Sequence, residues 1–337
     1  MKKVIFLDLG KHPITNNFLK TPKPDKEFFY NLKLVFNNKT KLISLANFVK
    51  PKMMFNDTYA HRASASMTMQ NAYNKLAEKI KKKYDPKKIL EIGSNDGVFI
   101  KNFKKVKNIG VEPCKNLAKI TKNMGIETYD EFWDFKLSNK IKEKHGKIDL
   151  IYSANTISHI HNLSETFKAI KNLLGEDGIF ILEDPSLMES LKNVAYDQFY
   201  DEHSYVFSIT ALKNITKDFD LEIFKIEKLK THGGSNRVYF KKIDNKKYKV
   251  SKIVMKQLKN EKKYGINQLK TYTKFASKVK KSKRNLIKIF KKLKKINKTV
   301  IGYGATYKSS TVLNYCKLNS NFIKYFLDTT PTKKGKY

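Results

Sequence analysis

The chain has 337 residues, enough for about two domains, and 40% of them are hydrophobic and 12% aromatic, which excludes a disordered chain. Its formal net charge is +38, from 69 Lys and Arg against 31 Asp and Glu residues, but only Arg62, Arg237 and Arg284 are arginines. Arginine is the side chain that chiefly reads phosphates and guanines. The lysine excess therefore indicates a codon bias, and we expect at most weak, sequence-blind nucleic-acid binding.

Cysteine content and apolar runs narrow the class further. Two cysteines, Cys114 and Cys316, are too few for a Cys₄ zinc site or a disulfide framework, so we expect no metal. The apolar run at 4–7 is too short for a signal peptide, and no run reaches the roughly 20 residues that span a membrane. We expect a soluble, cytoplasmic protein without a membrane partner; its oligomeric state stays open.

Residues 1–65 are predicted to form a small, strand-poor module. A strand is expected at 4–10, ended by Gly10, and two more at 32–36 and 41–45 form a hairpin-like pair. A helix follows at 66–83.

Residues 66–245 hold an alternation of strands and helices, which predicts a parallel sheet with helices on both faces. Strands are expected at 88–93, 109–113, 148–155, 178–185 and 236–240. Helices are expected from about Val98, at 114–124 and at 163–174.

The last part of the chain divides into two pieces. Residues 246–298 predict a basic helical connector, whose lysine run fits a solvated helix face better than a nucleic-acid site. Residues 299–337 predict a second strand–turn–helix unit, with strands at 299–305 and 322–328.

A cofactor site is indicated where the first strand of the alternation ends. Residues 91–97 read E-x-G-x-x-x-G, and Glu112 lies 19 residues after Gly93 at the end of the next strand. Glycines let the backbone turn tightly beside a ligand, and the carboxylate can accept both ribose hydroxyls. This spacing predicts an S-adenosylmethionine methyltransferase; the alternative is an αβ turn with a solvated acid. The predicted cofactor-binding residues are Glu91, Gly93, Asn95, Asp96, Gly97, Glu112 and Asn155. Tyr129, Phe132 and Trp133 are candidates for enclosing adenine or for ordinary core packing.

Histidines at the same sheet edge are candidates for the chemistry. Methyl transfer to carbon needs a base that removes a C–H proton, and histidine suits that role. His203 lies in YDEHSY after the last core strand, and His159 follows an earlier strand. His232 opens THGGSNR, whose backbone and Arg237 could hold a phosphate. The segment 302–310, GYGATYKSS, could receive an anion at a helix N-terminus or be only a tight turn.

These motifs resemble the nucleotide-sugar C-methyltransferases that make branched deoxysugars. The segments that carry the resemblance are DLG with Pro13 and Asn16, EIGSNDG, YDEHSY with HGGSNR, and GYGATYKSSTVLNY with Asp328. The resemblance implies an α/β fold: a small N-terminal module, a Rossmann-like methyltransferase sheet and a partial C-terminal Rossmann-like domain. It implies C3 deprotonation of a nucleotide-linked 4-keto sugar, followed by attack on the methyl of S-adenosylmethionine.

The resemblance also implies residue roles. His203 is the base, Tyr200 and Glu202 orient it or stabilise the enolate, and His159 lies near the sugar. The substrate-binding residues implied by the motifs are Tyr59, His232, Gly233, Ser235, Arg237, Tyr303 and Lys308. Two departures stand out. The family's zinc-binding cysteine pairs are absent, so no zinc is expected. The family continues beyond residues 334–335, so we expect a partial final domain, and either the chain is a truncated form or the substrate grip at that end is reduced.

Three other interpretations stay open. The same scaffold could methylate an oxygen or nitrogen of a sugar or small metabolite. A basic RNA methyltransferase is disfavoured by the scarcity of arginine and the lack of a catalytic cysteine motif. A catalytically impaired homologue that only binds ligands is disfavoured by the intact YDEH motif.

Overall fold

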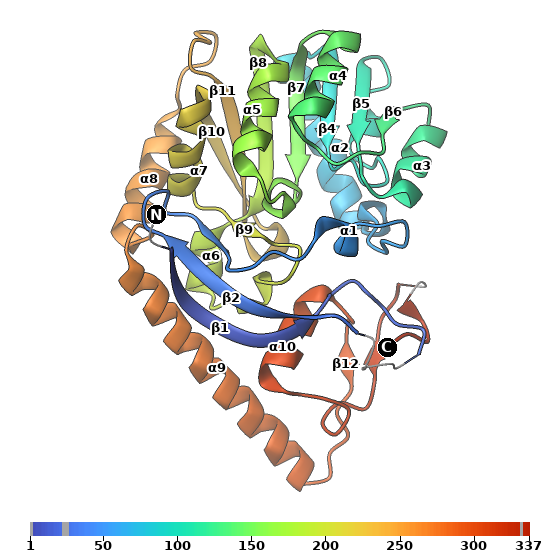
Figure 1. The fold of residues 1–337 in the computed structure, drawn as a ribbon, viewed down its shortest axis with the longest axis vertical. Coiled ribbons are helices and arrows are strands. Elements are labelled where there is room, and N and C mark those ends of the chain that lie inside the picture. Colours follow the sequence, from blue (N-terminus) through green and yellow to red (C-terminus); the bar gives the residue numbers. More distant parts are fainter. Residues whose placement is uncertain (1–2, 22–26, 331–332) are drawn as a thin grey trace.

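The computed structural model describes residues 3–21, 27–330 and 333–337, and its largest element is a seven-stranded sheet (Figure 1). In spatial order its strands are β10 (Leu221–Leu229), β11 (Ser235–Lys242), β8 (Leu174–Pro185), β7 (Ile148–Ala154), β4 (Lys88–Ile92), β5 (Lys107–Val111) and β6 (Glu127–Tyr129). The five strands from β8 to β6 are parallel, and β11 and β10 add antiparallel to them. The predicted parallel sheet is confirmed.

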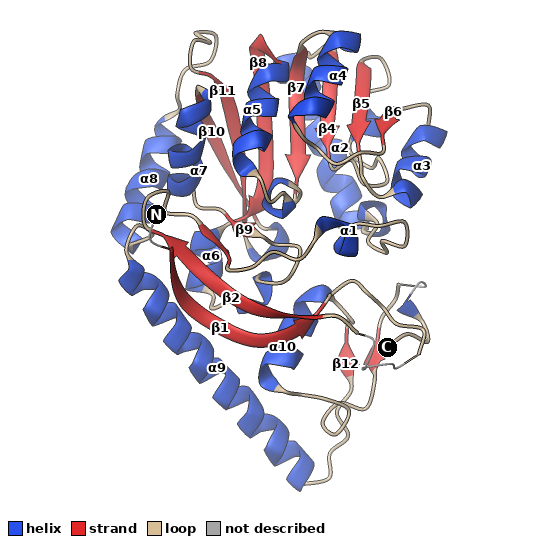
Figure 2. Ribbon diagram, viewed as in Figure 1, coloured by secondary structure: helices blue, strands red, loops and turns tan. Residues whose placement is uncertain are grey.

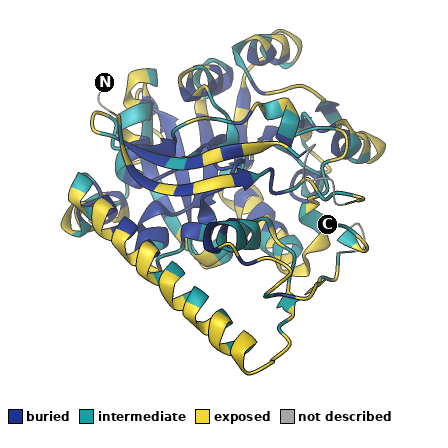
Figure 3. Ribbon diagram, turned by 60° about the horizontal axis from the view of Figure 1, so that its bottom comes forward, coloured by how far each residue is buried: buried dark blue, intermediate teal, exposed yellow. Residues whose placement is uncertain are grey.

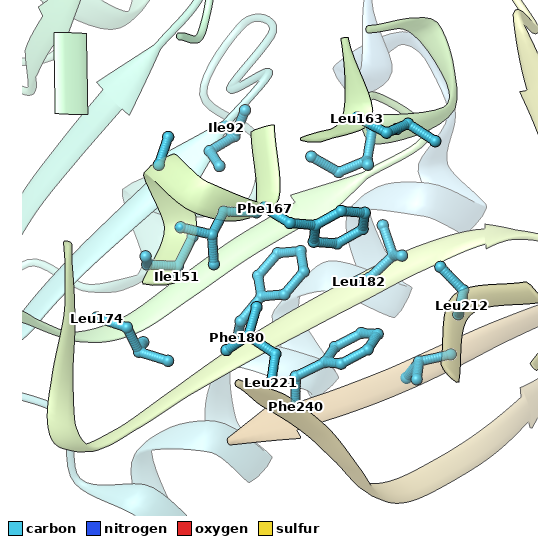
Figure 4. Packing of buried hydrophobic residues seen from close by; sticks show 14 of the residues in the cluster. Ile92, Ile151, Leu163, Phe167, Leu174, Phe180, Leu182, Leu212, Leu221 and Phe240 are labelled. Atoms are coloured by element: carbon cyan, nitrogen blue, oxygen red, sulfur yellow. The ribbon is translucent and has the colours of Figure 1, made fainter. Parts of the chain in front are cut away.

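Helices cover both faces of this sheet because its strands are apolar on both sides (Figure 2). On one face lie α4 (Phe135–His145), α5 (Leu163–Leu173) and α7 (Ile209–Thr216); on the other lies α2 (Met67–Tyr84). Phe167 of α5 packs over Phe180 and Phe240 of the sheet, whose rings lie 5.3 Å apart (Figure 4). The edge helix α3 (Lys115–Asn123) contacts β6.

A second, antiparallel sheet joins the N-terminal residues to the centre of the chain. Its order is β1 (Lys3–Pro13), β2 (Phe29–Asn37), β3 (Ile43–Leu45) and β9 (Tyr205–Val206). The prediction of a strand-poor module is wrong, because β1 runs on past Gly10, which takes a φ of +84° where the register shifts. The short helix α1 (Pro51–Met54) follows β3.

This second sheet shares a core with elements from the rest of the chain. Its apolar face packs with α6 (Leu187–Lys192), the start of α9 (Leu269–Lys295) and α10 (Tyr307–Cys316). The predicted helical connector is two helices, α8 (Lys252–Tyr264) and α9, separated by Gly265 at a φ of +89°. The far half of α9 is largely exposed and rich in lysine (Figure 3). The last strands, β12 (Gly302–Tyr303) and β13 (Phe326–Leu327), pair in parallel.

One predicted helix is missing. The residues after Val98 form only a 3₁₀ turn, Ile100–Asn102. The Asn102 side chain donates to the carbonyls of Val98 and Phe99, at 3.1 and 2.8 Å, and so competes with helical hydrogen bonds. Among the described residues, no helix is long and apolar enough to cross a membrane.

Candidate active site

A large cavity lies at the carboxyl edge of the parallel strands. It is lined by Gly93, Glu112 and Asn155, which directly follow β4, β5 and β7, and by Pro185, the last residue of β8. Its volume is about 1230 Å³. A pocket for one drug-sized ligand takes about 300–1,000 Å³. The cavity therefore has room for a cofactor together with a second molecule.

The turn after β4 can be made only with glycine. Gly93 has a φ of +74°, and a Cβ on it would lie 2.0 Å from Oγ1 of Thr156. The carboxylate of Glu112 accepts the backbone N–H groups of Asn95 at 2.8 Å and Cys114 at 2.9 Å. These bonds hold the turn against the end of β5. They leave each carboxylate oxygen a further lone pair that can accept a ribose hydroxyl.

Several polar atoms of this region are buried without a protein partner. They are Oε2 of Glu91, Oγ of Ser94 and Nε1 of Trp133, and all three residues line the cavity. Buried polar groups normally have hydrogen-bond partners. The residues present therefore fit a polar ligand such as S-adenosylmethionine.

The side chains of two residues predicted to bind cofactor hold a neighbouring segment of the chain. The Asn95 side chain accepts the N–H of Ala63 at 2.9 Å and donates to the carbonyl of His61 at 3.2 Å. Asp96 accepts from the backbone and the hydroxyl of Ser64, the latter at 2.5 Å. Asn95 still lines the cavity, whereas Asp96 and Gly97 lie outside its described lining. The cofactor turn thus fixes the segment 61–64 over the cavity.

The YDEH segment brings Tyr200, Glu202 and His203 to the same cavity. Nδ1 of His203 lies 2.7 Å from the main-chain oxygen of Gln198, and Nε2 lies 2.7 Å from the hydroxyl of Tyr200. A carbonyl only accepts, so Nδ1 carries the proton and Nε2 accepts from Tyr200. Burial lowers the pKa of His203 well below its usual range, so the imidazole is neutral.

The carboxyl groups of Asp201 and Glu202 each accept hydrogen bonds from neighbouring residues. Asp201 accepts from the hydroxyl of Thr15 at 2.7 Å and from its N–H at 3.3 Å. Glu202 accepts from the hydroxyl of Tyr59 at 3.1 Å and from the side-chain amide of Asn16. Burial raises the pKa of both carboxyls. Their charge is therefore costly in the folded protein.

His159 lies beside His203, with the ring centroids 5.3 Å apart, and its other neighbour is the ring of Phe55 at 5.5 Å. Its Nε2 is buried without a partner. Burial lowers the pKa of His159 to about 3. A neutral imidazole with a vacant nitrogen is thus available to the second ligand.

The structure separates the other predicted substrate residues into two groups. Tyr59, His232 and Lys308 line the cavity, as do the predicted aromatic residues Phe132 and Trp133. The described lining does not include the remaining predicted residues, which are Tyr129, Gly233, Ser235, Arg237 and Tyr303.

Hydrogen bonds and exposure explain why most of these residues lie elsewhere. Arg237 on β11 faces Glu183 and Glu227 in the neighbouring strands and donates to them at 2.9 and 3.0 Å, so it is not available for a phosphate. Tyr303 is 87% exposed, and the Tyr129 hydroxyl donates to Glu127 at 3.0 Å.

Sequence reasoning missed several lining residues. Gln198, His61, Arg62 and Tyr307 are among them, and the Tyr307 ring packs 4.9 Å from the ring of Tyr200. Gln198 could have been noticed as a polar residue two positions before the YDEH motif. His61 and Arg62 lie in a segment that Asn95 and Asp96, distant in sequence, hold at the cavity, and no local pattern reveals such contacts.

This fold and this site define an S-adenosylmethionine-dependent methyltransferase. Family models agree: residues 59–226 match "Methyltransferase domain", residues 230–337 match "C-methyltransferase C-terminal domain", and residues 1–55 match "Putative zinc binding domain". In chain order, these segments are similar to the domains that C-methyltransferases combine.

The individual proteins that this chain resembles share less than a third of its residues. The chain is 28% identical over 336 residues to the C-methyltransferase NovU of Streptomyces niveus. The aligned region covers 98% of this chain and 80% of NovU. A protein of Pyrococcus horikoshii is 15% identical, with a TM-score of 0.43 over 58% of this chain and 96% of its own. A methyltransferase of Clostridium acetobutylicum is 16% identical, with a TM-score of 0.40 over 51% and 91%.

Residues 1–55 match a zinc-binding description, but this segment lacks the set of cysteine and histidine side chains that usually binds zinc. It contains no cysteine and one histidine, His12, whose Nε2 bonds the main-chain oxygen of Leu9 at 3.0 Å. Within the described residues no group of three or more His, Cys, Asp or Glu side chains could hold a metal. The expectation of no zinc stays a prediction.

Replacing Glu112 tests the cofactor site. We expect Glu112→Ala to weaken S-adenosylmethionine binding about 10- to 100-fold, because it removes charged hydrogen bonds of about 1.5–3 kcal/mol. Glu112→Gln keeps one acceptor oxygen, so its affinity for S-adenosylmethionine should lie between those of the wild type and Glu112→Ala. Titration calorimetry measures both, with Glu131→Ala, an exposed carboxylate paired with Lys140, as the control. Unchanged affinity in Glu112→Ala would contradict the assignment.

Replacing Glu202 tests the cost of the buried charge. Its folded pKa is raised, so the penalty appears as the pH rises from the unfolded value of about 4.3 and is complete above the folded value. Glu202→Gln removes that penalty, so its free energy of unfolding should exceed the wild-type value at pH 9, with the gain fading towards pH 5. Denaturant unfolding at both pH values measures this, with the exposed Glu143→Gln as control. A gain larger at pH 5 than at pH 9 would refute it.

Proposed function

We propose that this chain transfers a methyl group from S-adenosylmethionine to a carbon beside the ketone of a nucleotide-linked deoxysugar. The observation that carries the proposal is the Tyr200–His203 pair, which opens onto the same cavity as the turn after β4. S-adenosylmethionine, when bound, supplies an electrophilic methyl group. The protein must then supply a base, a partner for the enolate oxygen and a grip on the nucleotide.

The base in this proposal is the Tyr200–His203 pair acting together. The Tyr200 oxygen takes the carbon-bound proton while its own proton passes to Nε2 of His203. Nδ1–H stays on the Gln198 carbonyl throughout, so the imidazolium forms in a fixed orientation. A neutral imidazole is the form that can accept a proton, and burial maintains it.

His159 is the proposed partner of the enolate oxygen. The negative charge that develops on that oxygen needs a hydrogen-bond donor already in place. Nε2 of His159 is buried, unpartnered and near the base, and its low pKa keeps the ring neutral. A neutral His159 can donate a hydrogen bond to the enolate oxygen without adding a positive charge beside the Tyr200–His203 pair.

The proposed nucleotide end lies towards α10. Lys308 lies in the first turn of this helix and lines the cavity together with Thr306 and His232, whose Nε2 is buried and unpartnered. A helix N-terminus and a lysine together favour a phosphate group. This supports a sugar carried on a nucleoside diphosphate.

The competing proposal, methylation of an oxygen or nitrogen, requires neither a carbon base nor an enolate partner. Hydrogen exchange separates the two, because only the carbon mechanism labilises a C–H bond before methyl transfer.

We expect His203→Ala and Tyr200→Phe each to slow that exchange about 10²- to 10⁴-fold, the usual contribution of general-base catalysis. The measurement is NMR of deuterium uptake from solvent by a nucleoside-diphosphate 4-keto-6-deoxyhexose, without methyl donor. His145→Ala is the control, since His145 contacts Glu127 and neither residue is in the described cavity lining. Exchange at the wild-type rate in both variants would overturn the base assignment, and its absence in the wild type would favour methylation of oxygen or nitrogen.

A further inference from the structure

Gln198 is a buried residue of the cavity, and one of its polar atoms lacks a hydrogen-bond partner. It ends the 3₁₀ turn Tyr196–Gln198, is 3% exposed and lines the cavity. Its main-chain oxygen accepts from Nδ1 of His203, and its side-chain Nε2 donates to the main-chain oxygen of His232 at 2.7 Å. The side-chain oxygen, Oε1, is buried and has no protein partner.

The orientation of this amide follows from its neighbour. The main-chain oxygen of His232 can only accept, so the NH₂ group of Gln198 must face it and Oε1 must lie on the other side. His232 itself has a φ of +54°, a strained value for a residue that is not glycine. The hydrogen bond from the Gln198 side-chain amide to its main-chain oxygen helps to hold it there. Gln198 therefore cannot turn its NH₂ group to a ligand without releasing His232.

An acceptor that is fixed, buried and unpartnered selects its ligand. Oε1 can be satisfied only by a donor, and a polar atom left without one is costly in a dry site. A ketone or ether oxygen placed there would be repelled. A hydroxyl or an amino group would be bound.

We propose that Gln198 determines substrate specificity by accepting a hydrogen bond from a hydroxyl or amino group of the sugar. The same residue holds the base through its main chain, so this donor lies on the part of the sugar that carries the reacting carbon. This inference rests on the proposed function and adds to it a requirement: the substrate keeps a donor near that carbon.

Binding measurements test this without turnover. Wild type and Gln198→Met, both saturated with S-adenosylhomocysteine, are titrated with nucleoside-diphosphate 4-keto sugars in which one hydroxyl at a time is replaced by hydrogen. We expect one deoxy sugar to bind the wild type about 10- to 100-fold more weakly than the parent, and Gln198→Met to lose that difference. Gln268→Met, at the start of α9 and outside the described lining, serves as control.

The outcomes separate the two proposals. Equal weakening of every sugar by Gln198→Met would show that Gln198 only supports His232, and a wild type that binds all the sugars equally would also overturn the specificity role. Discrimination of the deoxy sugar without methylation of carbon would uphold this inference and refute the proposed function. Binding of none of the sugars by the wild type would overturn both.

Discussion

The site depends on the burial of one short segment, residues 199–203, among contacts from three distant parts of the chain. The turn that follows β1 supplies the hydroxyl and N–H of Thr15 to Asp201, 186 positions away. Helix α10 supplies the hydroxyl of Thr311 to the main-chain oxygen of Phe199, at 3.0 Å. The methyltransferase sheet supplies His159. The base is in place only when all three parts are assembled.

Burial of this segment also sets its electrostatics. The side chains are buried, and the described ion pairs place no lysine or arginine on Asp201 or Glu202, so desolvation has the largest effect on the pKa of each titratable group. The histidines stay neutral and the carboxyls resist ionisation. The net charge of +38 does not determine this chemistry, because many of the lysines lie on exposed surfaces such as the far half of α9. The stability lost by burying such groups is consistent with a site arranged for proton transfer.

Local sequence signals predicted the elements that hold the cofactor turn, and the reason is physical. Strands β4 and β5 are short apolar runs, and Gly93 and Glu112 stand where those runs end. What the sequence could not show is register and distant pairing. Arg237 follows a turn that suits a phosphate, but pairing of β11 with β8 places it opposite Glu183. The contact of Asn95 with Ala63 and the reach of β1 past Gly10 likewise depend on partners distant in sequence.

The proposed chemistry requires that one cavity hold both a methyl donor and a base for carbon. It is tested most directly by the position of the transferred methyl group. The protein is incubated with S-adenosylmethionine carrying a ¹³C-labelled methyl and with a nucleoside-diphosphate 4-keto sugar deuterated beside the ketone, and the product is analysed by NMR and mass spectrometry. We expect ¹³C bonded to the ring carbon that has lost its deuterium. A labelled methyl on oxygen or nitrogen, with the deuterium retained, would contradict it.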